Sequence, residues 1–571
     1  MVQRKAVPAG KSKSGLRSKM LLGNFLVAYL RRAGVRHIFG LPGDLVLGLF
    51  HRFGRERGLD VVTFSHEPSV GFAADGYARS TRRVGVLCVT YGAGGHNVVN
   101  PVAGAYAEQV PLLVVSGGPG VEESQVASVH HQVKDIAGQH RIFREVTCAA
   151  RVIEHPERAA EEVHEVMTAI ANESRPGYLE IHRDIVEMSI PVPKHIVDWD
   201  GSFPVPKSDR RKLSEAVSDT ARLIRAAKRP VMIGGVELYR ARAERGFLAL
   251  AEKLGVPVAT TILGKGVFPM DHPQHLGIHV GPFSAKEIQA RIRSADLVLA
   301  LGTQLTDLNL GASRPQVSRE TSVWAVSDRV NISYHSYTDV MLKDFVDALG
   351  KSALPKFRER IRYYDNLKRK TRKGGKLSIN DLLVEIDDFL EQHPIYDVFA
   401  ESGDMLFGGL EVRVRKGGVY FAQGYYASMG FAVPAALGSA IGGGRRPLIL
   451  CGDGGFQMTG SEISQAPKLG LAPIVVLVNN SGWGIFRPVT ARQDLLEIPN
   501  WPYAQLAEAF GGLGLAASSA GELNEALRTA HADSRFSIID CTIPRSDGSP
   551  ISRRYIKASM RKGQSNTPGS R

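Results

Sequence analysis

The sequence predicts an α/β protein built from three doubly wound parallel-sheet domains. Short apolar runs recur along the chain and alternate with segments of helical periodicity, which is typical of parallel strands covered by helices on both faces. A length of 571 residues exceeds what one hydrophobic core supports, because domains usually hold about 100–200 residues. The clearest strand candidates are residues 84–90, 112–116, 231–234, 297–301, 448–451, 474–478 and 537–541.

Changes in composition divide the chain into three blocks. Pro191, Pro193, Pro204 and Pro206 mark an extended junction after the first block, since proline favours linkers and turns. A strongly basic segment separates the second block from the third. We therefore expect a basic tail at 1–17, a first domain at 18–193, a linker at 194–208, a central domain at 209–349, a basic linker at 350–376, a third domain at 377–556 and a tail at 557–571.

The positive charge of the chain is unevenly distributed. The formal net charge is +14, but the excess lies mainly in the first and last nineteen residues and in 356–376, and the rest of the chain is mildly acidic. Charge runs of this kind are usually solvated tails and linkers. We therefore expect no nucleic-acid partner.

Cysteine spacing and hydropathy restrict the protein class further. The four cysteines, Cys88, Cys148, Cys451 and Cys541, are far apart and show no zinc-binding spacing. The chain has no apolar run of about 18 residues and no apolar stretch before a cleavage site near its start. We therefore expect a cytoplasmic protein without a membrane segment.

A motif in the third block points to a bound metal ion. Gly452-Asp453-Gly454 follows one strand candidate, and Asn479-Asn480 lies at the end of the next, with 24 residues between Gly454 and Asn479. A carboxylate and an amide oxygen at neighbouring strand ends suit a magnesium ion that bridges phosphate oxygens. Two ordinary strand-to-helix turns would explain an isolated Gly-Asp-Gly, but not its pairing with the two asparagines.

This pairing resembles the signature of the thiamine-diphosphate enzyme superfamily. The resemblance implies thiamine diphosphate and Mg²⁺ as cofactors, with the diphosphate at backbone N–H groups near a helix N-terminus. The implied metal ligands are Asp453, Asn480 and the Gly482 carbonyl, and the implied cofactor contacts include Gly454, Gly455, Asp404 and Asn480.

Two further segments resemble the remainder of that cofactor site. His66-Glu67-Pro68 resembles the segment whose glutamate shares a proton with the aminopyrimidine ring, which makes Glu67 the implied catalytic carboxylate. A capping role at the helix that begins near Pro68 is the alternative for Glu67. Residues 424–431 resemble the loop that bends the cofactor, with the Ala427 carbonyl and Met429 against the pyrimidine ring.

Other features resemble the pyruvate and indolepyruvate decarboxylase branch. Asp44 ends a Gly-Leu-Pro-Gly-Asp loop, and His130 and His131 form an adjacent pair; by the resemblance these three side chains handle protons. Thr90 and Asp307, the latter in a Thr-Asp-Leu-Asn turn, are the implied lining of the substrate pocket.

Phe486 departs from the pattern of enzymes that act on pyruvate. They carry a glutamate six residues after the second asparagine, where this chain has Phe486. An apolar wall there favours a substrate with an aromatic side chain. The pattern is most similar to that of phenylpyruvate decarboxylases.

The resemblance implies decarboxylation of phenylpyruvate or indolepyruvate to an aldehyde and carbon dioxide. It also implies at least a dimer, and commonly a tetramer, because the first domain of one subunit completes the site on the third domain of another. Two alternatives remain open: a carboligase of the acetolactate-synthase kind, and a sensor that binds the cofactor without catalysis.

Overall fold

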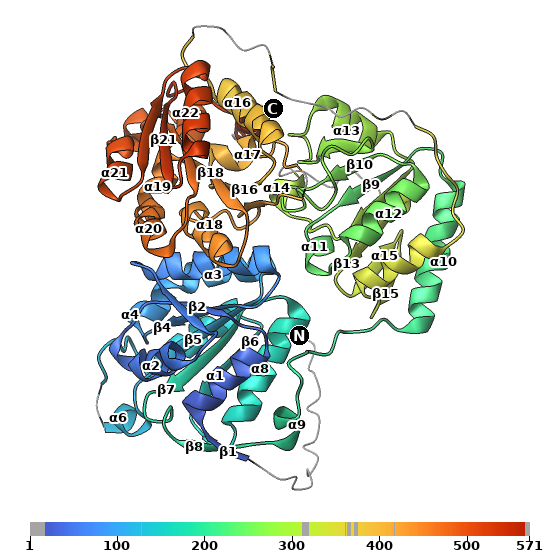
Figure 1. Ribbon diagram of the computed structural model, residues 1–571. Coiled ribbons are helices and arrows are strands. Elements are labelled where there is room, and N and C mark those ends of the chain that lie inside the picture. The colour runs from blue at the N-terminus through green and yellow to red at the C-terminus, as the bar shows by residue number, and fades with distance from the viewer. Residues whose placement is uncertain are drawn as a thin grey trace.

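The computed structural model forms three α/β parts, coloured blue to cyan, green to yellow and orange to red along the chain (Figure 1). It describes residues 18–126, 128–310, 319–359, 361, 367–369, 375–415 and 417–565. The expected tail at 1–17 and parts of the segments 350–376 and 557–571 lie outside the described residues.

The first part holds a six-stranded sheet in the order β3-β2-β4-β5-β7-β6, and every neighbouring pair in it is parallel. Successive side chains of a strand point to opposite faces. Val86 therefore packs with α1, α2 and α8, whereas Leu87 packs with α3, α5 and α7. The strands are β2 (His37–Gly40), β3 (Asp60–Thr63), β4 (Gly85–Val89), β5 (Leu112–Gly118), β6 (Ala149–Ile153) and β7 (Gly177–His182). The helices are α1 (Leu22–Arg32), η1 (Asp44–Val46), α2 (Leu47–Arg55), α3 (Glu67–Thr81), α4 (Ala93–Asn97), α5 (Val99–Ala107), α6 (Val121–Val126), α7 (Gly138–Val146), α8 (Ala159–Glu173) and α9 (Lys194–Val197).

A separate two-stranded antiparallel ladder closes this part. It joins β1 (Ser18–Leu21) to β8 (Ser189–Val192), so the beginning and the end of the first part lie side by side.

The central part holds a mixed sheet in the order β11-β10-β9-β12-β13-β14-β15. Its first five strands are parallel, as predicted, but β14 and β15 extend the sheet as an antiparallel hairpin. These two strands are short and rich in polar residues, so no apolar run marked them. The strands are β9 (Pro230–Gly234), β10 (Val258–Thr260), β11 (His275–Ile278), β12 (Leu297–Leu301), β13 (Ser322–Val326), β14 (Arg329–Ile332) and β15 (His335–Thr338). The helices are α10 (Arg210–Ala226), α11 (Glu237–Arg240), α12 (Glu244–Leu254), α13 (Lys286–Arg293), α14 (Asp307–Leu310), η2 (Arg319–Thr321) and α15 (Leu342–Lys351).

The third part repeats the parallel design with the strand order β17-β16-β18-β19-β21-β20. The strands are β16 (Tyr396–Ala400), β17 (Tyr420–Ala422), β18 (Arg446–Gly452), β19 (Ile474–Asn479), β20 (Leu513–Ala517) and β21 (Ser537–Thr542). The helices are α16 (Ile379–Gln392), α17 (Asp404–Gly408), α18 (Ala432–Ile441), α19 (Asp453–Thr459), η3 (Gly460–Gln465), α20 (Ala466–Leu469), η4 (Gly484–Val489), η5 (Gln493–Leu496), α21 (Tyr503–Ala509), α22 (Ala520–Ala532) and α23 (Pro550–Ser565). The α/β prediction is confirmed, and the described residues differ from an all-parallel design at the antiparallel edge of the central sheet and at the separate β1–β8 ladder.

Helices α3 and α18 join the first part to the third. They cross closely and share one hydrophobic core cluster, and Figure 1 shows them stacked at the boundary. The approach depends on glycine: a Cβ on Gly76 would lie 2.0 Å from the Ala435 carbonyl oxygen, and one on Gly438 would lie 1.9 Å from that of Ala73. The Ser65 N–H also donates to the Glu462 carboxylate across this boundary.

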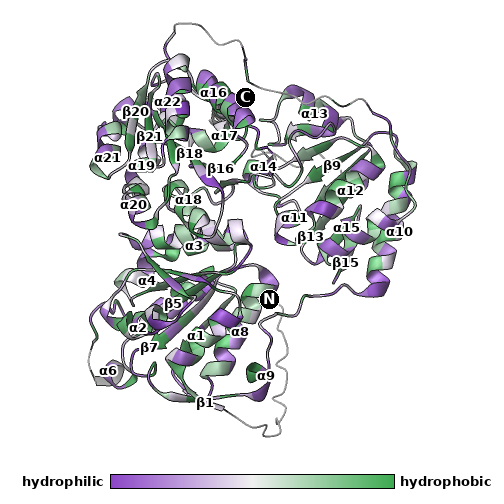
Figure 2. Cartoon of the chain, viewed as in Figure 1, coloured by the Kyte–Doolittle hydropathy of each residue, from purple (hydrophilic) through white to green (hydrophobic). Residues whose placement is uncertain are grey.

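Hydropathy follows the layers of the three parts. The outer helices α10 and α13 carry hydrophilic stretches, while the sheets are largely hydrophobic (Figure 2). Among the described residues, no helix combines the length and apolar character needed to cross a membrane. The four cysteines are all free, and Cys88, Cys451 and Cys541 are buried in strands.

Candidate functional site

Asp453 and Asn480 lie at the carboxyl ends of two adjacent parallel strands, β18 and β19. Both are buried, at 2% and 7% exposure. The Asp453 carboxylate accepts the N–H groups of Gly454 (2.8 Å), Asn480 (3.2 Å) and Gly482 (3.1 Å). Burial raises the pKa of Asp453, and these backbone N–H groups oppose the rise. The backbone thus fixes a buried carboxylate beside Asn480.

The Asn480 side chain shows what this pair can hold. Its Oδ1 atom is buried and has no hydrogen-bond partner among the described residues. Buried polar atoms almost always have a partner. An unpaired amide oxygen beside a carboxylate, near a helix N-terminus, is a donor set that fits a divalent oxygen-seeking cation together with phosphate oxygens. The residues present therefore fit Mg²⁺ and a diphosphate group.

A pocket of about 260 Å³ opens at this edge of the third sheet. Residues from the turns after β16, β18 and β19 line it together with Leu308 of the central part. The predicted site residues that line it are Asp404, Ala427, Met429, Asp453, Gly454, Gly455, Asn480, Gly482 and Phe486.

The loop that carries Ala427 and Met429 has an unusual backbone. Ala427 has φ +58° and Gly430 has φ +85°. The left-handed conformation is uncommon for a residue with a side chain and costs about 1 kcal/mol or more, so surrounding bonds must hold it. Ser402 supplies one, because its hydroxyl donates to the Ser428 carbonyl oxygen at 2.8 Å.

Glu401, which no sequence motif indicated, supplies the other bonds. Its carboxylate accepts the N–H groups of Ser402 (2.9 Å), Gly430 (3.1 Å) and Ala432 (2.9 Å). The side chain is 1% exposed, and burial raises its pKa to about 6 while these N–H groups hold it down. It also packs under Gly455, where a Cβ would lie 2.5 Å from the Glu401 Cγ. The sequence signal that could have indicated Glu401 is its position directly after the buried apolar strand β16.

Asp404 is the first residue of α17 and joins the pocket to the start of the last helix. Its carboxylate accepts the Ser549 N–H at 3.0 Å and the Ser549 hydroxyl at 2.8 Å. Burial raises its pKa, and hydrogen bonds from Ser552 and Ser549 oppose the rise.

Glu67 lies in the first turn of α3, in the other half of the predicted site. The N-cap residue of this helix is His66, and no side chain caps it, so Glu67 does not act as the cap. The half-buried carboxylate accepts the Asn97 side-chain amide at 3.0 Å. Gly94 lies behind it, since a Cβ there would come 3.5 Å from the Glu67 Oε1.

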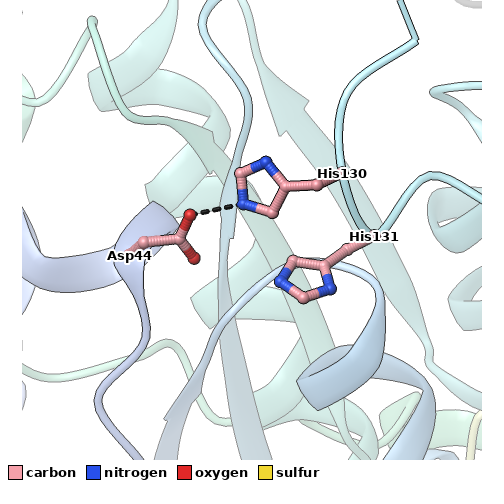
Figure 3. Close-up of side chains that lie close together, drawn as sticks. All are labelled: Asp44, His130 and His131. Atoms are coloured by element: carbon pink, nitrogen blue, oxygen red, sulfur yellow. Dashed lines mark hydrogen bonds and ion pairs between the residues drawn. The ribbon is translucent and has the colours of Figure 1, made fainter.

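Asp44, His130 and His131 lie together in the first part (Figure 3). The His130 Nε2 and the Asp44 Oδ2 are 2.5 Å apart. Partial burial raises the pKa of Asp44, but the hydrogen bond and charge of His130 outweigh it, so the pKa is lowered overall. His131 has φ +70°, and its ring lies 4.6 Å from that of His130 between centroids.

Two predicted pocket residues do not line this pocket within a single chain. Asp307 is exposed and does not line the pocket, whereas the next residue, Leu308, does. Thr90 packs against Gly43, beside Asp44, instead of against the third sheet. None of the described residues of 18–193 lines the pocket, so Glu67, Asp44, His130 and His131 lie outside it in a single chain.

Comparison with known families gives three matches in order along the chain. Residues 20–140 match the thiamine pyrophosphate enzyme N-terminal TPP binding domain, residues 217–349 the central domain, and residues 405–541 the C-terminal TPP binding domain. Thiamine pyrophosphate is another name for thiamine diphosphate.

Similar curated proteins cover nearly the whole chain. An indole-3-pyruvate decarboxylase from Azospirillum brasilense is 35% identical over 95% of this chain and 99% of its own length. A probable pyruvate decarboxylase from Schizosaccharomyces pombe is 28% identical over 93% of this chain and 94% of its own length. Pyruvate decarboxylase 1 from Oryza sativa subsp. indica is 31% identical over 86% of this chain and 82% of its own length.

Proposed function

We propose that the substrate of this protein is an aryl 2-keto acid. The premise is that the chain belongs to the family of thiamine-pyrophosphate-dependent 2-keto acid decarboxylases. Phenylpyruvate or indolepyruvate would be converted to the aldehyde and carbon dioxide. One observation carries this choice of substrate: Phe486, at the position where the resemblance to pyruvate decarboxylases implies a glutamate, lines the pocket and is 52% exposed there.

Other apolar side chains support an aromatic substrate. Phe407, Ile485, Leu308 and Tyr555 line the same pocket as Phe486. Apolar walls with a few fixed polar groups are typical of sites for apolar ligands. The methyl group of pyruvate would leave much of this wall without contact, whereas an aromatic ring would cover it.

The cofactor would bind at the polar end of the pocket. Asp453 and the unpaired Asn480 Oδ1 would hold Mg²⁺ with the Gly482 carbonyl, and the N-terminus of α19 would face the diphosphate. When bound, the cofactor supplies the nucleophilic carbon and the electron sink that decarboxylation requires. Ala427 and Met429 would orient its pyrimidine ring.

The side chains of the first part would manage protons. Glu67 would hold a proton at the pyrimidine ring, with Asn97 fixing its carboxylate. Asp44 and His130 share a short hydrogen bond and would deliver the proton that completes the aldehyde, with His131 beside them.

A second copy of the chain would complete the site. The pocket is lined only from the central and third parts, while Glu67, Asp44 and the histidine pair belong to the first. Bringing them to one substrate requires the first part of another subunit. We therefore propose at least a dimer, and a tetramer would be a pair of such dimers.

Product analysis tests this function. Purified protein with thiamine diphosphate and Mg²⁺ should release carbon dioxide and free aldehyde from phenylpyruvate, and a Glu67→Gln variant should lose most of that turnover. A 2-hydroxy ketone as the main product would indicate a carboligase instead. Cofactor binding without carbon dioxide release from any keto acid would indicate a sensor and would overturn the proposal.

A further inference from the structure

The cluster of Asp44, His130 and His131 has the composition of a transition-metal site. Each residue offers one ligand atom, and these atoms lie within 4.8 Å of one another. Figure 3 shows the His130 ring hydrogen-bonded to the Asp44 carboxylate, with the His131 ring beside that of His130. The planes of the two rings are inclined at 61°, so their nitrogen atoms can face a common point from different directions.

The backbone holds the three residues in place. His131 has φ +70°, and the loop behind it fits closely, since a Cβ on Gly92 would lie 2.2 Å from the His131 carbonyl oxygen. Asp44 begins η1, and Gly43 before it packs so tightly that a Cβ there would lie 2.6 Å from the Thr90 Cβ. The main chain is thus fixed while the side chains retain freedom to turn.

That freedom is sufficient for coordination. The His130 and Asp44 side chains are 55% and 46% exposed. A tetrahedral zinc ion with bonds of about 2.0–2.1 Å needs ligand atoms about 3.3 Å apart. The His130–Asp44 pair is already closer than that, and rotation of exposed side chains can bring His131 within reach.

We propose that Asp44, His130 and His131 bind a Zn²⁺ ion. The ion would replace the proton that His130 and Asp44 share, and His131 would add the third ligand. Two imidazole nitrogens and one carboxylate are a donor set of zinc sites that keep a fourth position open. Mg²⁺ prefers oxygen ligands and would stay at Asp453 and Asn480.

Zinc at this cluster would inhibit the enzyme, and this consequence rests on the proposed function. The ion would occupy the three groups assigned to proton transfer, and metal-bound nitrogens no longer exchange protons. Turnover of the Mg²⁺-loaded enzyme should therefore fall as Zn²⁺ is added, and a chelator should restore it. The binding itself does not depend on the identity of the substrate.

The test measures metal binding to the full chain without substrate. Zn²⁺ is titrated calorimetrically into wild-type protein in excess Mg²⁺ and thiamine diphosphate, and Co²⁺ is used as a second probe whose visible absorption reports nitrogen ligation. The variants are His130→Gln, His131→Gln and Asp44→Asn. His335→Gln, an exposed histidine in β15, is the matched control.

We expect one tight site per chain in the wild type and the control. The Zn²⁺ affinity of each cluster variant should fall by more than 100-fold, because loss of a partner that only hydrogen-bonds to a metal ligand already costs roughly 10- to 100-fold. All three side chains are exposed, so the variants should retain the wild-type circular dichroism. Equal Zn²⁺ affinity in the wild type and the cluster variants would overturn the proposal. Absence of decarboxylation with binding intact would instead count against the proposed function alone.

Discussion

Replacing Gly76 with alanine should separate α3 from α18. The new Cβ would lie 2.0 Å from the Ala435 carbonyl oxygen, whereas ordinary contacts begin near 3.4 Å. The helices would therefore have to move apart by about 1.4 Å along this contact. The obstacle is backbone, so no side-chain rotation can relieve it.

The energetic cost follows from the packing at this crossing. Phe72 and Phe431 meet edge to face with centroids 5.9 Å apart in the same core cluster. Overpacking a well-filled core typically costs about 1–3 kcal/mol, which exceeds the gain of up to about 1 kcal/mol that alanine brings to a helix. Because Glu67 begins α3, activity should fall as well.

Thermal unfolding and turnover measure this effect. Each kcal/mol should lower the midpoint of the affected transition by about 2–4 °C for a part of this size. Gly521→Ala in α22 is the matched control, since its Cβ would meet nothing within 4 Å, and it should be neutral or stabilising. A Gly76→Ala protein with wild-type stability and activity would refute the argument that these helices approach through glycine.

Three further predictions concern the pocket and one buried acid. Glu401→Gln should weaken thiamine diphosphate binding roughly 5- to 150-fold in an equilibrium titration, because an unmet buried hydrogen bond costs about 1–3 kcal/mol. The amide NH₂ of glutamine cannot accept the backbone N–H groups that the carboxylate accepts. Unchanged affinity would contradict the role of Glu401 in holding the loop. Phe486→Glu should lower kcat/KM for phenylpyruvate by roughly 10- to 200-fold, and a variant that keeps its aryl preference would remove the support for an aromatic substrate. Burial raises the pKa of Glu180 from its ordinary value near 4.5 to about 7, so the folded state binds more protons than the unfolded state. The stability of the folded state therefore falls as pH rises from 4.5 to 7. Glu180→Gln removes this loss, so its unfolding midpoint relative to wild type should be higher at pH 8 than at pH 5, by an amount corresponding to about 2.5 kcal/mol. An equal difference at both pH values would show that Glu180 does not cause the pH dependence.

Much of the fold follows from apolar runs in the sequence. Every strand candidate became a strand of a parallel ladder, because strands buried on both faces need continuous apolar residues. The hairpin of β14 and β15 could not be found in this way, since a sheet edge that faces solvent tolerates polar residues such as Arg329 and His335.

The candidate site likewise contains residues that could be predicted from the sequence and residues that could not. Motifs named nine of the residues that line the pocket, among them Asp453 and Asn480, because chemistry restricts the type and spacing of such residues. Glu401 carries no motif, and its role depends on burial and on partners distant in sequence. Asp307 and Leu308 show the limit of a motif: it located the turn but not which of its side chains reaches the pocket.

The most direct test compares substrates on one preparation of the enzyme. With thiamine diphosphate and Mg²⁺ present, kcat/KM is measured for phenylpyruvate, indolepyruvate and pyruvate by aldehyde formation. We expect a preference for both aryl substrates of roughly tenfold or more, since each methylene-sized apolar contact contributes about 1–3 kcal/mol. Preference for pyruvate would contradict it.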